Sequence, residues 1–316
     1  MLSSFSHPSP QQLIVALALI AGIVVLAYSQ SGMKGERGRV EEHLTLNSKV
    51  LGKPVEYSIY LPPDYETGTR HYPVIYMMHG GDDGEDADWF RFARINIMLD
   101  RLIGSGDIPP VIVVTPDGRR DAANRNNTYY MNDADGAFRW EDMFVQDFVP
   151  TVEKQYRAIG TQQARAIAGL SMGGYAALAY SMRHPKLFVA AAALSAALRT
   201  DNQIVSMDQA GYDRRYGKAW GMGLAGEARL NDRYRDYSVL HMVDALPLQN
   251  LKATPFYLDC GAKDQFFVDG NAILHEKLRD RGVTHAFMSR PGIHDWDYWR
   301  SGIEGAVRFV ADRLQR

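Results

Sequence analysis

The sequence predicts an α/β fold with a mostly parallel central sheet, helices on both faces and antiparallel strands at its N-terminal end. Short apolar runs alternate with longer amphipathic stretches, and repeated strand–helix–strand units of this kind build parallel sheets. Residues 41–48 and 55–61 alternate apolar and polar side chains, as an antiparallel pair with one solvated face does. A chain with 46% hydrophobic and 23% charged residues has an ordinary globular composition.

The parallel strands are expected where short apolar runs could be buried on both faces. Each run is followed by a turn signal or by a stretch with helical periodicity. Strands are predicted at residues 72–78, 111–115, 165–168, 189–194, 255–260 and 285–289, and helices at 89–103, 142–156, 175–183, 271–281 and 297–314.

The first 40 residues are set apart from the catalytic domain predicted for residues 41–316. The run between Leu13 and Tyr28 is apolar over about sixteen residues, which is short for a membrane span and long enough for a signal-peptide core. Small residues suit cleavage after Ser29, whereas Lys and Arg occur only after the run and favour an uncleaved anchor. We expect an exported chain with a signal peptide or membrane anchor, then a linker at 30–40. A buried core helix is the alternative.

One block, at about 196–246, interrupts the alternation. It is rich in Arg, Asp, Tyr and Gly, shows no clear period, and is too polar for a core and too long for a simple loop. It is interpreted either as an insertion over the substrate end of the sheet or as a solvated surface excursion.

Charge and cysteine content exclude several classes of protein. The formal net charge is −2, and no basic run or basic–aromatic stripe occurs, so no nucleic-acid partner is expected. The single cysteine, Cys260, excludes an intrachain disulfide. It lies in the apolar run 255–260, which predicts an inert thiol in a buried strand.

The strongest local signal is Gly169-Leu170-Ser171-Met172-Gly173, which fits the Gly-x-Ser-x-Gly pattern between a predicted strand and a predicted helix. The serine of such a turn has a strained backbone, and side chains two positions before and after it would collide. The turn exposes the hydroxyl and aims a helix N-terminus at the site. We therefore predict that Ser171 is a nucleophile.

A serine hydroxyl needs a base, and in this fold the chain order is Ser, acid, His. Of the histidines after Ser171, only His294 lies in a loop after the last strand; His184, His241, His275 and His285 are interpreted as structural. The predicted acid is Asp264, which follows the strand at 255–260. Asp259, Asp269 and Asp295 are the alternatives.

Two backbone N–H groups are expected to bind the oxyanion. The predicted donors are Met172, directly after the nucleophile, and Gly81 in the loop after the first parallel strand, with Asp82 as the alternative. His79 is interpreted as a structural turn residue. The acidic stretch 82–88 could hold calcium but does not match the EF-hand spacing, and a solvated loop at the start of a helix is favoured.

With these residues in place, the sequence resembles the putative-esterase family of α/β hydrolases, which includes feruloyl and acetyl-xylan esterases, S-formylglutathione hydrolases, iron-chelator esterases and mycolyltransferases. The resemblance implies the α/β-hydrolase fold and Ser171, Asp264 and His294 as the triad. It implies a carboxylic-ester hydrolase that needs no cofactor or metal. The motifs that carry the resemblance lie at residues 60–65, 72–81, 140–142, 169–174, 260–264 and 292–296.

We expect acyl transfer through an acyl-enzyme. The substrate would be a small-molecule or polysaccharide ester, such as an acyl or feruloyl ester of a carbohydrate. An anionic iron-chelator ester is disfavoured by the acidic loop beside Gly81. An acyltransferase and a non-catalytic binding protein on the same scaffold are the alternatives. Aromatic residues near the motif loops could stack on sugar or phenolic groups; they are Trp89, Tyr129, Tyr130, Phe266, Phe267 and Trp296.

Overall fold

The computed structural model describes residues 37–315, which contain one eight-stranded sheet in the order β1-β2-β4-β3-β5-β6-β7-β8. The predicted signal or anchor between Leu13 and Tyr28 lies outside the described residues. Strands β1, β2 and β4 pair antiparallel, and every other neighbouring pair is parallel. The predicted mixed sheet is thereby confirmed. Its strands are β1 (Arg39–Ser48), β2 (Lys53–Leu61), β3 (Val74–Met78), β4 (Ile112–Pro116), β5 (Arg165–Leu170), β6 (Ala190–Leu194), β7 (Phe256–Gly261) and β8 (His285–Arg290).

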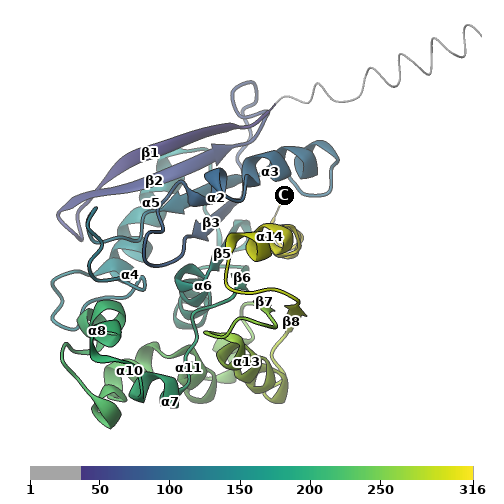
Figure 1. Ribbon diagram of the computed structural model, residues 1–316. Coiled ribbons are helices and arrows are strands. Elements are labelled where there is room, and N and C mark those ends of the chain that lie inside the picture. Colours follow the sequence, from purple (N-terminus) through teal and green to yellow (C-terminus); the bar gives the residue numbers. More distant parts are fainter. Residues whose placement is uncertain (1–36, 316) are drawn as a thin grey trace, which may run out of the picture. The chain divides into compact units, whose positions relative to one another are not determined.

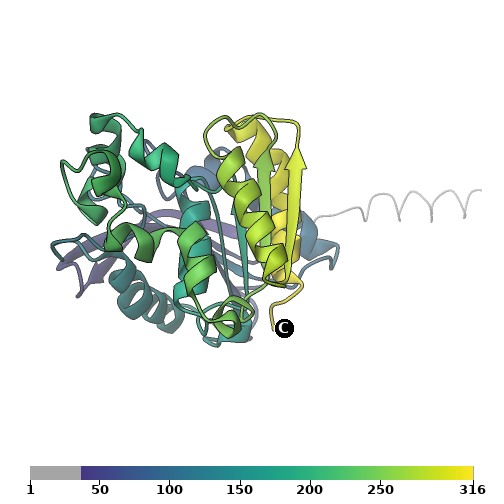
Figure 2. The ribbon, with the colours of Figure 1, turned by 90° about the horizontal axis from the view of Figure 1, so that it is seen from below.

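Helices cover both faces of the sheet (Figures 1 and 2). Alternate residues of a strand point to opposite faces. In β3, Ile75 and Met77 join the core shared with α3 (Ile95–Gly104) and α14 (Trp296–Ala311), whereas Tyr76 belongs to the opposite core. The helices of that opposite core are α5 (Val149–Gln155), α6 (Met172–Arg183), α11 (Val239–Ala245) and α13 (Val268–Asp280).

Several boundaries differ from those predicted, and three of the differences have a clear structural cause. The first strand begins at Arg39, inside the stretch assigned to a linker, because Arg39 pairs with Leu61. The helix predicted at 89–103 is two helices, α2 (Asp88–Arg91) and α3, because Arg94 adopts a left-handed conformation with φ of 51°. The helix predicted at 142–156 starts earlier and passes through a π-helical turn. Its parts are α4 (Trp140–Met143), the turn Phe144–Phe148, and α5.

The segment 196–246 is helical and has its own aromatic packing. Tyr216 stacks on Trp220 with ring centroids 4.1 Å apart, and Tyr234 meets Trp220 edge-on at 5.0 Å. All three side chains are buried. The expectation that this block is too polar for a core was wrong, because its tyrosines pack inward while its arginines and aspartates face out or bind backbone. Its elements are α7 (Asp201–Val205), α8 (Gln209–Tyr212), a π-helical turn (Asp213–Gly217), α9 (Lys218–Trp220), a 3-10 turn (Gly226–Arg229), α10 (Asp232–Tyr237) and most of α11.

The acidic stretch 82–88 is only partly solvated, which corrects the expectation of a solvated loop. Asp82 and Asp83 are exposed, but Asp86 and Asp88 are buried. Asp86 accepts hydrogen bonds from the hydroxyl of Ser58 and the backbone N–H of His43. It thereby joins this loop to the first two strands.

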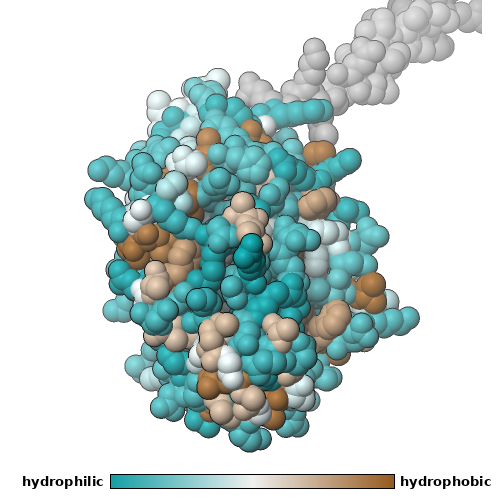
Figure 3. All heavy atoms as spheres, turned by 60° about the vertical axis from the view of Figure 1, so that its left-hand side comes forward, coloured by the Kyte–Doolittle hydropathy of each residue, from teal (hydrophilic) through white to brown (hydrophobic). Residues whose placement is uncertain are grey.

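Cys260 is buried in β7, as predicted, and burial raises the pKa of its thiol to about 12. Within residues 37–315, no helix combines the length and the apolar character that a membrane span requires. One face of the molecule carries hydrophobic side chains only in small separate groups among hydrophilic ones (Figure 3), which is typical of an ordinary solvated surface.

Glu141 of α4 connects three parts of the fold. Its carboxylate pairs with Arg183 and His184 at the end of α6, each at 2.8 Å, and accepts a hydrogen bond from the hydroxyl of Tyr237 in α10. Burial raises the pKa of Glu141, but the hydrogen bonds of His184, Arg183 and Tyr237 and the charge of Arg183 outweigh burial and lower that pKa to about 2.

We predict that Glu141→Ala lowers the free energy of unfolding by about 3 kcal/mol near pH 7, because it leaves the partly buried Arg183 without a carboxylate partner. Because the folded-state pKa is depressed, this stabilisation is complete above the ordinary value of 4.5 and is lost as the pH falls towards 2. Urea unfolding of the wild type and of Glu141→Ala across this pH range measures the difference in the free energy of unfolding. Glu227→Ala, at an exposed glutamate, is the control. Equal losses in the two variants, or a loss from Glu141→Ala that does not shrink at low pH, would contradict the prediction.

Candidate active site

Ser171 lies at the turn between β5 and α6 with φ of 53° and ψ of −117°, a strained conformation for a residue with a side chain. Neighbouring strands fix the turn, since the Ser171 N–H donates to Leu194 at 2.9 Å and its carbonyl accepts from Ala197 at 2.9 Å. The flanking glycines are needed for close packing. A Cβ on Gly169 would lie 2.4 Å from the carbonyl of Gly173, and one on Gly173 would lie 2.2 Å from the carbonyl oxygen of Met78.

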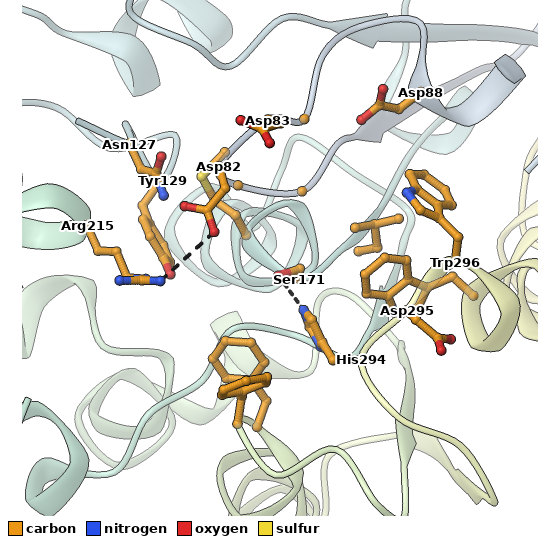
Figure 4. A pocket seen from close by; sticks show the side chains of 18 of the residues that line it. Asp82, Asp83, Asp88, Asn127, Tyr129, Ser171, Arg215, His294, Asp295 and Trp296 are labelled. Atoms are coloured by element: carbon orange, nitrogen blue, oxygen red, sulfur yellow. Dashed lines mark hydrogen bonds and ion pairs between the residues drawn. The ribbon is translucent and has the colours of Figure 1, made fainter. Parts of the chain in front are cut away.

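The structure brings Ser171, His294 and Asp264 into one line of hydrogen bonds, of which Figure 4 shows the bond between Ser171 and His294. His294 Nε2 lies 2.9 Å from Ser171 Oγ, and His294 Nδ1 lies 2.7 Å from Asp264 Oδ2. The three residues follow the carboxyl ends of β5, β8 and β7, which meet at one edge of the sheet.

Asp264 is fully buried and points at His294 from the loop after β7. Its second oxygen accepts hydrogen bonds from the backbone N–H groups of Phe266 and Phe267, at 3.1 and 3.2 Å. Burial raises the pKa of Asp264, but the hydrogen bond and charge of His294 and these two N–H donors outweigh burial, so the pKa is lowered. An ionised Asp264 can only accept, so it holds the proton of His294 on Nδ1 and leaves Nε2 free to accept from Ser171.

The other candidates for the acid of the triad lie outside this line of hydrogen bonds. Asp259 is buried between Arg290, at 3.0 Å, and the hydroxyl of Tyr298. Asp295 caps α14 by accepting from the N–H of Tyr298 at 2.9 Å. Asp269 lies in the first turn of α13.

The remaining candidate histidines have partners outside this line of hydrogen bonds. His184 pairs with Glu141, His241 with Asp201, and His275 with His285. His79 is buried; its Nε2 accepts from the N–H of Gly118 at 2.7 Å and lies 3.5 Å from Asp117. These contacts agree with the structural roles predicted for these histidines.

Gly81 and Met172 lie beside each other above Ser171. A Cβ on Gly81 would be 3.6 Å from the Cβ of Met172 and 3.1 Å from Nδ2 of Asn127. Met172 is the first residue of α6, so its N–H has no acceptor within the helix. In residues 37–315 no acceptor is paired with the N–H of Gly81 either. Among the described residues, both N–H groups are therefore without an acceptor, and the predicted oxyanion role of each stays a prediction.

These residues line a cavity of about 600 Å³ that has two chemically different walls (Figure 4). The apolar wall is aromatic: Trp296 packs against Phe92 at 5.2 Å and against Trp299 at 5.3 Å. Of the aromatics predicted near the site, Tyr129, Phe266, Phe267 and Trp296 line the cavity. Trp89 and Tyr130 do not, because both are wholly buried in the core. The polar wall is formed by Asp82, Asp83, Asn127, Tyr129, Arg199 and Arg215.

The sequence analysis missed Asn127, Arg199 and Arg215. None belongs to a motif, and Arg199 and Arg215 lie in the segment without periodicity, so no local signal places them at the cavity. A possible metal-binding group within residues 37–315, formed by His43, Glu56 and Asp86, does not contribute to the cavity lining.

Comparison with known families gives a match to the family described as Putative esterase over residues 48–310. An esterase of Mycobacterium tuberculosis is 28% identical over 269 residues, which cover 79% of this chain and 55% of the relative. The chain thus spans about half the length of that relative. An acetyl esterase of Caldicellulosiruptor saccharolyticus is 25% identical over 84% of this chain and 95% of its own length.

Solved structures show the same fold. A ferulic acid esterase is 30% identical and superposes with a TM-score of 0.74 over 88% of this chain and 99% of its own. An S-formylglutathione hydrolase from Agrobacterium tumefaciens, only 15% identical, matches in fold with a TM-score of 0.69 over 90% of this chain and 98% of its own. The chain therefore has the α/β-hydrolase fold expected from the sequence.

The packing of the serine turn predicts the effect of adding one methyl group. Alanine normally stabilises a helix relative to glycine by about 1 kcal/mol, but in Gly173→Ala the new Cβ would collide with the backbone of Met78 and His79. We expect a loss of about 3 kcal/mol in the free energy of unfolding. Gly104→Ala is the matched control, since a Cβ at this last residue of α3 meets nothing within 4 Å. A Gly173→Ala variant as stable as Gly104→Ala would refute the packing argument.

Proposed function

Since the chain belongs to the Putative esterase family, we propose that it is a serine hydrolase of carboxylic esters that works through an acyl-enzyme on Ser171. The observation that carries the proposal is the line from Ser171 Oγ through His294 to the buried carboxylate of Asp264. A general base beside a strained, half-buried serine that faces a cavity is the arrangement that acyl transfer requires.

In the first half-reaction, His294 Nε2 takes the proton of Ser171 as Oγ attacks the ester carbonyl. The N–H groups of Met172 and Gly81 stabilise the negative charge that develops on the carbonyl oxygen. His294 then gives its proton to the departing alcohol, and Asp264 stabilises the imidazolium in between. In the second half-reaction, water attacks the acyl-enzyme with His294 again as the base, and Ser171 regains its proton.

The cavity supports a small acyl or aromatic-acyl ester of a carbohydrate as the substrate. Phe92, Trp296 and Trp299 offer flat apolar surface to a phenolic ring, and the opposite wall offers polar groups to an alcohol rich in hydroxyls. The 30% identity to a ferulic acid esterase favours the same class of ester. The apolar run between Leu13 and Tyr28 has the length of a signal-peptide core. We therefore propose that the protein acts outside the cytoplasm.

The proposal is tested with purified residues 31–316, methyl ferulate, acetylated xylan and the Ser171→Ala variant. We expect hydrolysis by the wild type and a loss of roughly 10⁴- to 10⁶-fold in kcat in the variant, as in other serine triads. Near-native thermal unfolding of the variant serves as the control for folding. Retention of more than about a tenth of the activity would remove Ser171 from the chemistry.

Asp264→Asn should keep the shape of the site but reverse the hydrogen-bonding role of its partner, because an amide can donate to Nδ1 and favour the wrong imidazole tautomer. The expected loss in kcat is about 10⁴-fold. Asp295→Asn, at the cap of α14, should lose about tenfold or less, and Asp259→Asn should act on stability through Arg290 and Tyr298. If Asp264→Asn stays close to wild type while either of the others collapses in kcat, the acid of the triad is that other residue.

A further inference from the structure

Arg199 lies on the polar wall of the cavity and has no hydrogen-bond partner within residues 37–315. Its Nε is fully buried and unpaired. No carboxylate of the described chain forms an ion pair with its guanidinium, and no carbonyl accepts from it. A cation withdrawn from water without a partner is costly in a folded protein.

Other arginines with buried or half-buried side chains are paired. Arg165 binds Glu153 at 2.6 Å, and Arg229 donates to the carbonyl of Met207 at 2.6 Å. Arg120 and Arg157 also have an unpaired Nε, but their terminal nitrogens are bonded to Asp133 and to the carbonyl of Tyr65, respectively. Arg199 differs from all four because none of its nitrogens has a hydrogen-bond or ion-pair partner among the described residues 37–315.

The position of Arg199 is fixed by its neighbours. The next residue, Thr200, caps α7, and Gln203 completes a reciprocal capping box. The guanidinium lies over the ring of Phe267, 4.7 Å from its centroid, and the same ring lies 5.0 Å from the ring of His294. Arg199 is thereby held within reach of a molecule bound at Ser171.

None of the carboxylates that line the cavity forms an ion pair with Arg199, although the charge of Asp82 contributes to the raised pKa of its guanidinium. Asp82 pairs with Arg214 at 3.1 Å and lies 3.9 Å from Arg215 (Figure 4). Asp88 accepts from the N–H of Glu85, and Asp295 caps α14. The sequence-based argument that the acidic loop disfavours anionic substrates is therefore weakened, since the loop's nearest acid is already paired with arginines.

A second unpaired group lies on the same wall. Asn127 is 4% exposed and lines the cavity, yet its Oδ1 has no hydrogen-bond donor in the described chain. Buried amides are normally satisfied. The guanidinium of Arg199 can only donate, whereas Oδ1 of Asn127 can only accept, so this wall suits a ligand that carries both an acceptor oxygen and a hydroxyl donor.

We propose that Arg199 is a specificity-determining residue that binds a carboxylate on the substrate. This inference rests on the proposed esterase function and narrows it to esters that carry an acid group in addition to the ester bond. A planar carboxylate matches the guanidinium fork. The guanidinium carbon lies 4.7 Å from the centroid of the Phe267 ring, and within residues 37–315 no acceptor occupies its N–H groups.

Two matched pairs of substrates test the proposal, and each pair differs only in whether the acid is free or methylated. Chlorogenate and its methyl ester place the acid on the alcohol half; 4-nitrophenyl hydrogen succinate and its methyl ester place it on the acyl half. In the pair whose carboxylate, on the alcohol or on the acyl half of the ester, binds Arg199, we expect the wild type to hydrolyse the free acid with a higher kcat/KM than the methylated ester. Arg199→Gln should lower that preference in kcat/KM by roughly 10- to 100-fold, mainly through KM, and change hydrolysis of the methylated ester little.

Arg199→Lys should retain part of the preference, because it keeps the charge without the fork. Arg235→Gln is the control. Arg235 is an exposed arginine of the segment 196–246, which also contains Arg199, and its substitution should leave the preference for the free acid unchanged. Calorimetry with quinate and succinate on Ser171→Ala, with and without Arg199→Gln, measures carboxylate binding independently of turnover.

Equal rates for acid and methylated ester in both pairs, or a preference that survives Arg199→Gln, would overturn the proposal and leave the esterase function standing. An equal loss on both members of a pair would assign Arg199 a structural role only and also overturn it. Hydrolysis of methyl ferulate without hydrolysis of any ester in either pair would also overturn the proposal. If the wild type hydrolyses none of these esters and neither methyl ferulate nor acetylated xylan, the proposed function itself fails.

Discussion

The site depends on one steric constraint, the close packing of the serine turn against the end of β3. Ser171 can hold its strained backbone only because Gly169 and Gly173 lack side chains, and Gly173 lies almost in contact with the carbonyl of Met78. The same contact sets the start of α6 beside the loop that contains Gly81. One packing arrangement thus turns the hydroxyl towards the cavity and brings two N–H groups to it, so that the proposed nucleophile and the proposed oxyanion site are formed together.

The site also requires that the buried carboxyl group of Asp264 stays ionised. Asp264 stays ionised inside the protein because two backbone N–H groups and His294 stabilise its charge. The imidazole of His294 packs edge-to-face against the rings of Phe267 and Trp299, with ring centroids 5.0 and 4.9 Å apart, respectively. The ring can therefore exchange a proton with Ser171 without losing its orientation, which is the preorganisation that acyl transfer needs.

The sequence predicted the sheet and the meeting of Ser171, Asp264 and His294 because these depend on local signals and on topology. Apolar runs mark the strands, glycines mark the serine turn, and loops after parallel strands must share one edge. The polar wall could not be predicted in the same way. Arg199 and Asn127 reach the cavity through folding of segments without periodicity. Trp89 and Tyr130 also show that an aromatic near a motif can belong to the core.

The most direct test of the central claim is to trap the acyl-enzyme. Wild-type protein mixed with excess 4-nitrophenyl acetate or methyl ferulate is quenched with acid within the first turnovers, and its intact mass and proteolytic peptides are measured. The account predicts one added acyl group, on the peptide that contains Ser171, and no such adduct in Ser171→Ala. Turnover without an adduct under conditions in which deacylation limits the rate, or an adduct on another residue, would contradict it.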